Sequence, residues 1–93
     1  MEAPITQAAG HSNHIVNVYE DRVEITSGWQ GQNRESIGHK DIAVVSVKGL
    51  VHCTLILETN TGRAYRVDRL SRPEASQIKK AIERQKQKAG LYE

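Results

Sequence analysis

The chain has 93 residues, of which 38% are hydrophobic and 26% are charged. This length fits one domain, and the composition is typical of a globular rather than a disordered protein. The single cysteine, Cys53, excludes an internal disulfide and favours a reducing compartment. The beginning of the chain lacks the basic and apolar pattern of a secretory signal, so we expect a cytoplasmic protein, with peripheral attachment to a membrane as an alternative.

The charge is unevenly distributed along the chain. The net charge is +2, but residues 63–88 contain nine Lys or Arg and three acidic residues, a net charge of +6. A basic segment of this kind attracts anionic partners. It is also the ordinary composition of a solvated helix face, and the sequence leaves both interpretations open.

The first third of the chain predicts a hairpin followed by a polar loop. Residues 1–12 are small and polar and indicate a flexible lead-in, or at most an added edge strand around Ile5. Residues 14–20 and 22–27 alternate apolar and polar positions, with a turn at Glu20 and Asp21, and predict two paired strands. Residues 27–33 predict a polar loop around Trp29, and residues 34–39 predict a short polar strand at the edge of a sheet.

The middle of the chain predicts three more strands. In residues 42–48, alternation places Ala43, Val45 and Val47 on one face and Ile42 and Val44 on the other. Residues 53–59 and 63–68 alternate as well and predict a second hairpin with Gly62 in its turn. Their inward positions are Cys53, Leu55, Leu57, Tyr65 and Val67.

After Ser71 the apolar period changes from that of a strand to that of a helix. Ala75, Ile78 and Ile82 recur at helical spacing and predict an amphipathic helix over residues 72–88, followed by a tail at 90–93. Ser71 and Glu74 have the spacing of a capping box, in which the hydroxyl accepts the Glu74 amide and the carboxylate accepts the Ser71 amide.

These elements predict a mainly β protein with one C-terminal amphipathic helix. Residues 37–45, IGHKDIAVV, resemble the I-x-x-x-D-I-x-x-V segment of small bacterial pleckstrin-homology-like (PH-like) domains. Residues 54–65, TLILETNTGRAY, are similar to the hairpin of the same domains. The resemblance covers residues 14 to about 86 and implies that 13–89 form a partly open barrel of six or seven antiparallel strands capped by the helix.

The same resemblance implies a non-enzymatic binding or assembly module. Eukaryotic lipid-binding members carry a basic motif around the first hairpin loop, whereas the predicted loop here, Glu20 and Asp21, is acidic. The resemblance therefore does not imply inositol phosphate recognition of that type.

The residues themselves also argue against catalysis. The four histidines, His11, His14, His39 and His52, lack the spacing of a metal site, and Cys53 lies at an apolar strand position. No phosphate-binding loop or nucleophile motif is present in the sequence. We expect no enzyme, cofactor, metal or small-molecule substrate, unless a pocket brings His39 or His52 together with acids.

Two groups of residues are candidates for binding a partner, and we favour a protein partner, with an anionic surface as the alternative. Trp29, with Gln30 and Gln32, either covers the core or anchors a protein partner, including a second copy of the chain. The predicted helix supplies cations for an anionic membrane or another polyanion, namely Arg72, Lys79, Lys80, Arg84, Lys86 and Lys88. Nucleic acid is a less favoured partner, because the helix lacks the aromatic residues that stack on bases.

Overall fold

The computed structural model describes residues 3–10, 14–28, 32–88 and 90. Within these described residues, seven strands and one 3₁₀ turn precede a single helix. Their bounds are β1 Thr6–Ala9, β2 Ile15–Val18, β3 Arg22–Ser27, β4 Asn33–Gly38, the 3₁₀ turn His39–Asp41, β5 Ile42–Lys48, β6 His52–Thr59, β7 Ala64–Ser71 and α1 Arg72–Lys88. The predicted mainly β chain with a C-terminal helix is thereby confirmed.

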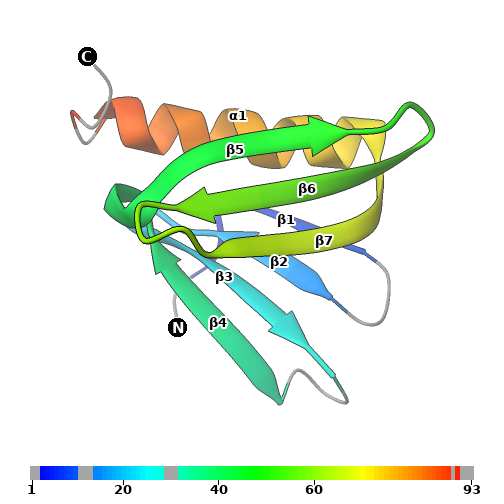
Figure 1. The fold of residues 1–93 in the computed structure, drawn as a ribbon, viewed down its shortest axis with the longest axis horizontal. Helices are drawn as coiled ribbons and strands as arrows, with labels where there is room; N and C mark the ends of the chain where they lie inside the picture. The colour runs from blue at the N-terminus through cyan, green and yellow to red at the C-terminus, as the bar shows by residue number, and fades with distance from the viewer. Residues whose placement is uncertain (1–2, 11–13, 29–31, 89, 91–93) are drawn as a thin grey trace.

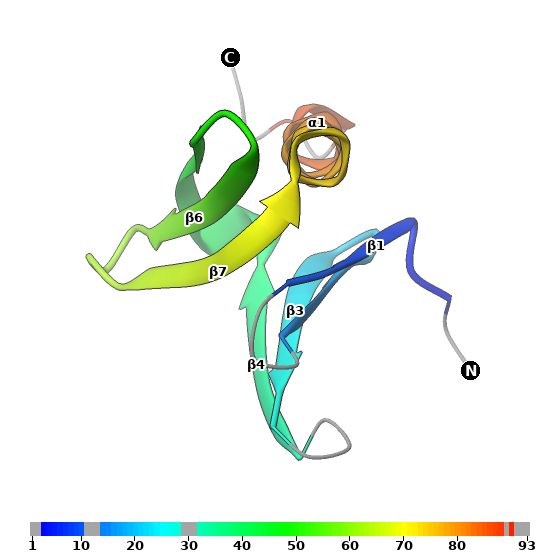
Figure 2. The ribbon, with the colours of Figure 1, turned by 90° about the vertical axis from the view of Figure 1, so that its right-hand side faces the viewer.

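The strands form two antiparallel sheets that do not close into a complete barrel. One sheet has the order β1-β2-β3-β4 and the other has the order β5-β6-β7. The two sheets face each other at an angle, and α1 lies along the side where β1 and β5 are its neighbours (Figures 1 and 2). The helix thus covers one open side between the sheets.

The core lies between the sheets and under the helix. The predicted inward residues Val16, Val18 and Val23 are buried, as are Leu55 and Leu57. The helix contributes its own buried face, made of Ala75, Ile78 and Ile82. Removal of this apolar surface from water is the main force that docks the helix on the sheets.

The N-terminal segment is a strand at its centre rather than a flexible lead-in. β1 pairs with β2 through the register Thr6↔Val18 to Ala9↔Ile15, so the edge-strand alternative describes this segment correctly. Ala8 is buried in the core. A Cβ atom on Gly10 would lie 2.5 Å from the Asp68 carbonyl oxygen, so the absence of a side chain there lets the end of β1 approach β7.

The predicted alternation in β5 holds for Val45 and Val47, which pack in or against the core, and is wrong at the start of the strand because of a bulge. The pairing with β6 shifts register between Ile42 and Val44. A bulge places two residues opposite one and moves the inward positions by one. Ile42 and Val45 are consequently buried together, whereas Ala43 is exposed and Val44 retains 46% of its accessible surface.

The start of the helix agrees with the predicted capping box in one of its two contacts. The Glu74 amide donates to Ser71 Oγ at 3.3 Å. The second contact is different, because the Ser71 hydroxyl donates to Glu74 Oε1 at 2.7 Å. β7 ends at Ser71 and α1 begins at the next residue, so the strand leads directly into the helix.

Candidate functional site: a basic helix beside an apolar turn

The helix presents cations on both sides of its exposed face. Arg72, Lys80, Arg84 and Lys88 are exposed, and Lys79 is half-buried. With 3.6 residues per turn, positions 80, 84 and 88 form one row, and positions 72 and 79 form a second. The structure therefore divides the predicted basic face into two rows.

Each row borders a hollow in the surface. The row of Lys80, Arg84 and Lys88 lies along a groove of about 470 Å³ between α1 and β1, where Ile5 and Thr6 form the opposite wall. Arg72 and Lys79 line a smaller hollow of about 250 Å³, with residues at the base of the β5–β6 hairpin: Val47, Gly49 and Cys53. Both hollows combine cationic and apolar surface.

Lys86 was predicted to belong to this basic face, and the structure corrects that prediction. Its side chain is buried, with 5% of the residue exposed, and its ammonium group donates to the Ile42 carbonyl oxygen. Burial lowers the pKa of Lys86 below its ordinary value of 10.5. Position 86 lies on the same side of the helix as Ile82, so Lys86 holds α1 on β5 and is withdrawn from solvent.

A short turn beside the first two turns of the helix carries two exposed aliphatic residues. Leu50 is 79% exposed and Val51 is 76% exposed, in the connection between β5 and β6. Figure 1 shows this turn extending past the N-terminal end of α1. The register pair His52↔Ser71 explains this position, because it sets the end of the turn opposite the residue that precedes the helix. Alternation did not single out these two residues, since they lie outside the predicted strands.

The predicted protein-binding loop is only partly described by the structure. Trp29 and Gln30 lie outside the described residues. Gln32 is exposed at the start of the β4 side of this hairpin, which extends away from the other sheet (Figures 1 and 2). β4 forms one edge of its sheet, as predicted for residues 34–39.

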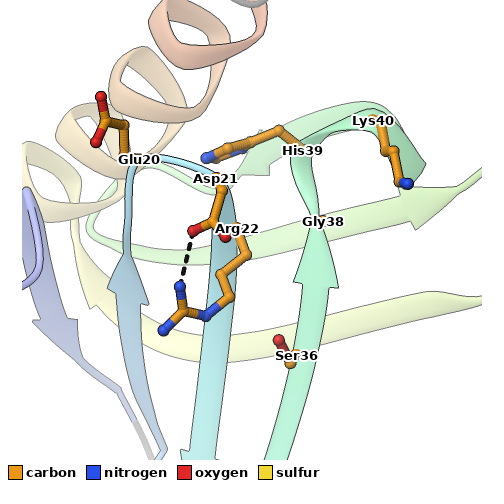
Figure 3. A pocket seen from close by; sticks show the side chains of 7 residues that line it. All are labelled: Glu20, Asp21, Arg22, Ser36, Gly38, His39 and Lys40. Carbon is orange, nitrogen blue, oxygen red and sulfur yellow. Dashed lines mark hydrogen bonds and ion pairs between the residues drawn. The ribbon is translucent and has the colours of Figure 1, made fainter. Parts of the chain in front are cut away.

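A second concave site lies at the β2–β3 turn and the corner between β4 and β5. This pocket, of about 620 Å³, brings His39 together with Glu20 and Asp21 (Figure 3). The Arg22 guanidinium donates to Asp21 Oδ1 at 2.7 Å and holds the pKa of that carboxyl below its ordinary value. The sequence analysis kept catalysis open only if a pocket brought His39 or His52 together with acids. The structure does bring His39 together with Glu20 and Asp21 in this pocket.

The geometry of His39 gives it a structural contact in that pocket. His39 Nε2 lies 2.8 Å from the Tyr19 carbonyl oxygen, and since a carbonyl only accepts, this nitrogen carries the proton. The ring is buried, and Nδ1 has no hydrogen-bond partner among the described residues. His39 thus ties the 3₁₀ turn to the end of β2, with its second nitrogen enclosed by protein rather than presented to the pocket.

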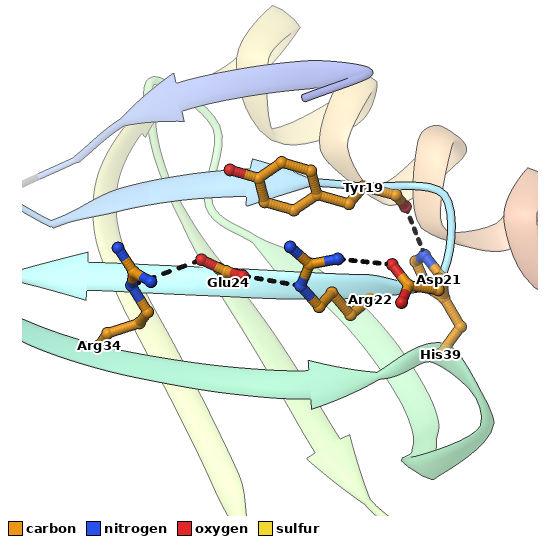
Figure 4. Close-up of polar contacts among 6 residues, drawn as sticks. All are labelled: Tyr19, Asp21, Arg22, Glu24, Arg34 and His39. Carbon is orange, nitrogen blue, oxygen red and sulfur yellow. Dashed lines mark hydrogen bonds and ion pairs between the residues drawn. The ribbon is translucent and has the colours of Figure 1, made fainter. Parts of the chain in front are cut away.

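The outer face of the first sheet carries an ion-pair row next to this pocket (Figure 4). Glu24 is buried and accepts from Arg22 Nε at 2.7 Å, and Arg34 Nε lies 3.5 Å from its other carboxylate oxygen. The Arg22 guanidinium also lies 4.3 Å from the centroid of the Tyr19 ring. These contacts satisfy a carboxylate that the sequence places at an outward strand position.

A scan of protein-family models and a search of curated proteins found no match to this chain. Among the residues that the structure describes, no group of three His, Cys, Asp or Glu side chains has the arrangement of a metal site. Within the same part of the chain, every helix falls short of the length or the apolar character needed to cross a membrane.

Proposed function

We propose that this protein is a non-enzymatic binding module of PH-like fold that docks on an anionic membrane surface through α1. The observation that carries the proposal is the exposure of cations on the free face of the helix. The described residues form seven antiparallel strands followed by one helix, an order that is compatible with the PH-like resemblance and supports a binding role.

The charge of the helix supports an anionic partner. α1 contains two acidic residues, Glu74 and Glu83, and Glu74 is already bonded to Ser71. The cations outnumber these acids even without the buried Lys86. Each Lys or Arg near an anionic bilayer contributes about 1 kcal/mol of attraction, so a group of this size is enough for reversible binding.

The test measures binding to vesicles of phosphatidylcholine with and without phosphatidylserine, by co-sedimentation at low ionic strength. Lys80→Gln together with Arg84→Gln is expected to weaken binding to the anionic vesicles by about 30-fold, from about 1 kcal/mol per charge. Arg63→Gln with Arg66→Gln removes the same charge from exposed positions outside the helix and serves as the control. Equal losses in both variants, or no binding by the wild type, would refute the proposal.

Self-association is the second candidate function, and the exposed edge of β4 favours it. Residues Asn33 to Ser36 are exposed in this strand, which has a neighbour in its sheet on one side only. An edge strand of this kind offers unpaired backbone groups to another strand. A mass in solution of twice 10.4 kDa, lowered by Trp29→Ala or by a proline in β4, is the result expected for a dimer through this hairpin.

A further inference from the structure

The turn between β5 and β6 carries the two most exposed large hydrophobic residues of the described part of the chain. The exposed fractions of Leu50 and Val51, 79% and 76%, exceed those of the other exposed large hydrophobic residues, Ile5 at 51% and Val44 at 46%. Exposure of two adjacent aliphatic side chains to water is unfavourable, and at the tip of a hairpin they do not stabilise the core. Their exposure indicates a contact outside the molecule.

The conformation of the turn does not require these two side chains. Gly49 has a φ of 108°, and a Cβ atom there would lie 2.4 Å from the His52 carbonyl oxygen, so the glycine determines the turn. The strand pairing ends at Lys48↔Thr54. Polar residues at positions 50 and 51 would leave this backbone unchanged.

Cations surround the base of the turn. Lys48 precedes it and is exposed. Arg72 and Lys79 reach the same place from α1, because they line one hollow together with Gly49. The acid nearest in the helix, Glu74, is hydrogen-bonded to Ser71. The aliphatic tip and the cations at its base match the two layers of an anionic bilayer. The tip would meet the acyl chains, and the cations behind it would meet the anionic headgroups.

We propose that Leu50 and Val51 insert into the acyl boundary of an anionic membrane while Lys48, Arg72 and Lys79 contact its headgroups. This inference rests on the proposed function and names the part of the protein that enters the bilayer. A hydrated polyanion would attract the cations but would gain nothing from the aliphatic pair. The surface of two side chains is also far smaller than the roughly 1,200–2,000 Å² that a stable protein interface buries. This difference disfavours a second copy of the chain as the occupant.

Three variants separate the apolar and the ionic contributions. Leu50→Ser with Val51→Ser removes the aliphatic pair, Arg72→Gln with Lys79→Gln removes two cations, and Val44→Thr removes an exposed aliphatic residue elsewhere as the control. Binding to phosphatidylserine-containing vesicles is measured by co-sedimentation, and binding to heparin by retention on a column. Thermal unfolding checks that each variant is folded.

The serine variant is expected to bind the vesicles at least about tenfold more weakly, because it lacks the two aliphatic side chains that would be partly buried in the bilayer. It should retain its affinity for heparin, whereas the glutamine variant weakens on both. Unchanged vesicle binding by the serine variant, together with a loss in the glutamine variant, overturns the insertion and leaves the proposed function intact. The proposed insertion is also overturned if the protein is a dimer in solution, the serine substitutions dissociate this dimer, and vesicle binding is unaffected.

Discussion

Lys86 gives the sharpest test of the structure, because the sequence places it on the surface and the structure buries it. Its ammonium group donates to the Ile42 carbonyl oxygen, and only 5% of the residue is exposed. A hydrogen bond from a charged donor is worth about 1.5–3 kcal/mol, offset in part by the cost of burying the charge. Lys86→Met keeps most of the stem and is expected to lower the free energy of unfolding by about 1–2 kcal/mol.

Lys86→Ala removes the stem as well and should cost more. Three further heavy atoms leave the core, at about 0.8 kcal/mol for each methylene group, so the alanine variant is expected to be about 2 kcal/mol less stable than the methionine variant. Urea unfolding followed by circular dichroism measures both differences. Equal stability of the two variants would show that the stem is not buried.

The pH dependence provides an independent check on the same residue. Burial lowers the pKa of Lys86 in the folded protein below 10.5, so between the lowered value and 10.5 the unfolded chain binds more protons than the folded one. Stability from this residue therefore rises with pH through that window, and the advantage of the wild type over Lys86→Met should widen from neutral to alkaline pH. A narrowing difference would refute the assignment. Lys86→Met should also leave vesicle binding unchanged, in contrast to the exposed lysines.

Three further substitutions test the packing of the fold, each by urea unfolding. Gly10→Ala is expected to cost about 1–3 kcal/mol, because its Cβ would collide with the β7 backbone at Asp68, and no loss would show that β1 does not approach β7. Ser71→Ala removes the helix cap and is expected to cost about 1 kcal/mol, whereas Ser76→Ala, on the same helix, should change little. Glu24→Ala removes the acceptor of Arg22 Nε, although Arg22 keeps its contact with Asp21, and is expected to cost about 1–2 kcal/mol. This loss should shrink in high salt only if the pair is open to solvent.

Local sequence patterns predicted the elements where packing follows a simple period. The alternation in β2, β3 and β6 matches their buried hydrophobic residues, although the polar residues Asn17 and Glu24 are buried as well. The period after Ser71 matches the buried apolar face of α1. Ser71 and Glu74 fixed the first residue of the helix, because a cap involves only neighbours in sequence. The hydrophobic period and the helix cap can both be identified within a short stretch of the sequence.

The errors arise where distant segments decide the outcome. The bulge in β5 depends on its register with β6, and the burial of Lys86 depends on a carbonyl group 44 residues earlier in the chain. Alternation does not define β1, because its one buried apolar residue, Ala8, is small and its pairing with β2 comes from the backbone. No periodicity in the sequence records such contacts.

The candidate site also depends on contacts between distant segments, because its residues form a surface only where the fold brings them together. The basic composition of residues 63–88 fits a solvated helix and an anion-binding face equally well. Antiparallel pairing of β6 with β7, and the direct passage of β7 into α1, bring the β5–β6 turn to the first turns of that helix. A solvated helix would not need an aliphatic pair at this position, whereas a surface that docks on a bilayer would use both. The exposure of Leu50 and Val51 therefore favours the proposed docking of this end of the molecule on a bilayer over a helix face that is merely solvated.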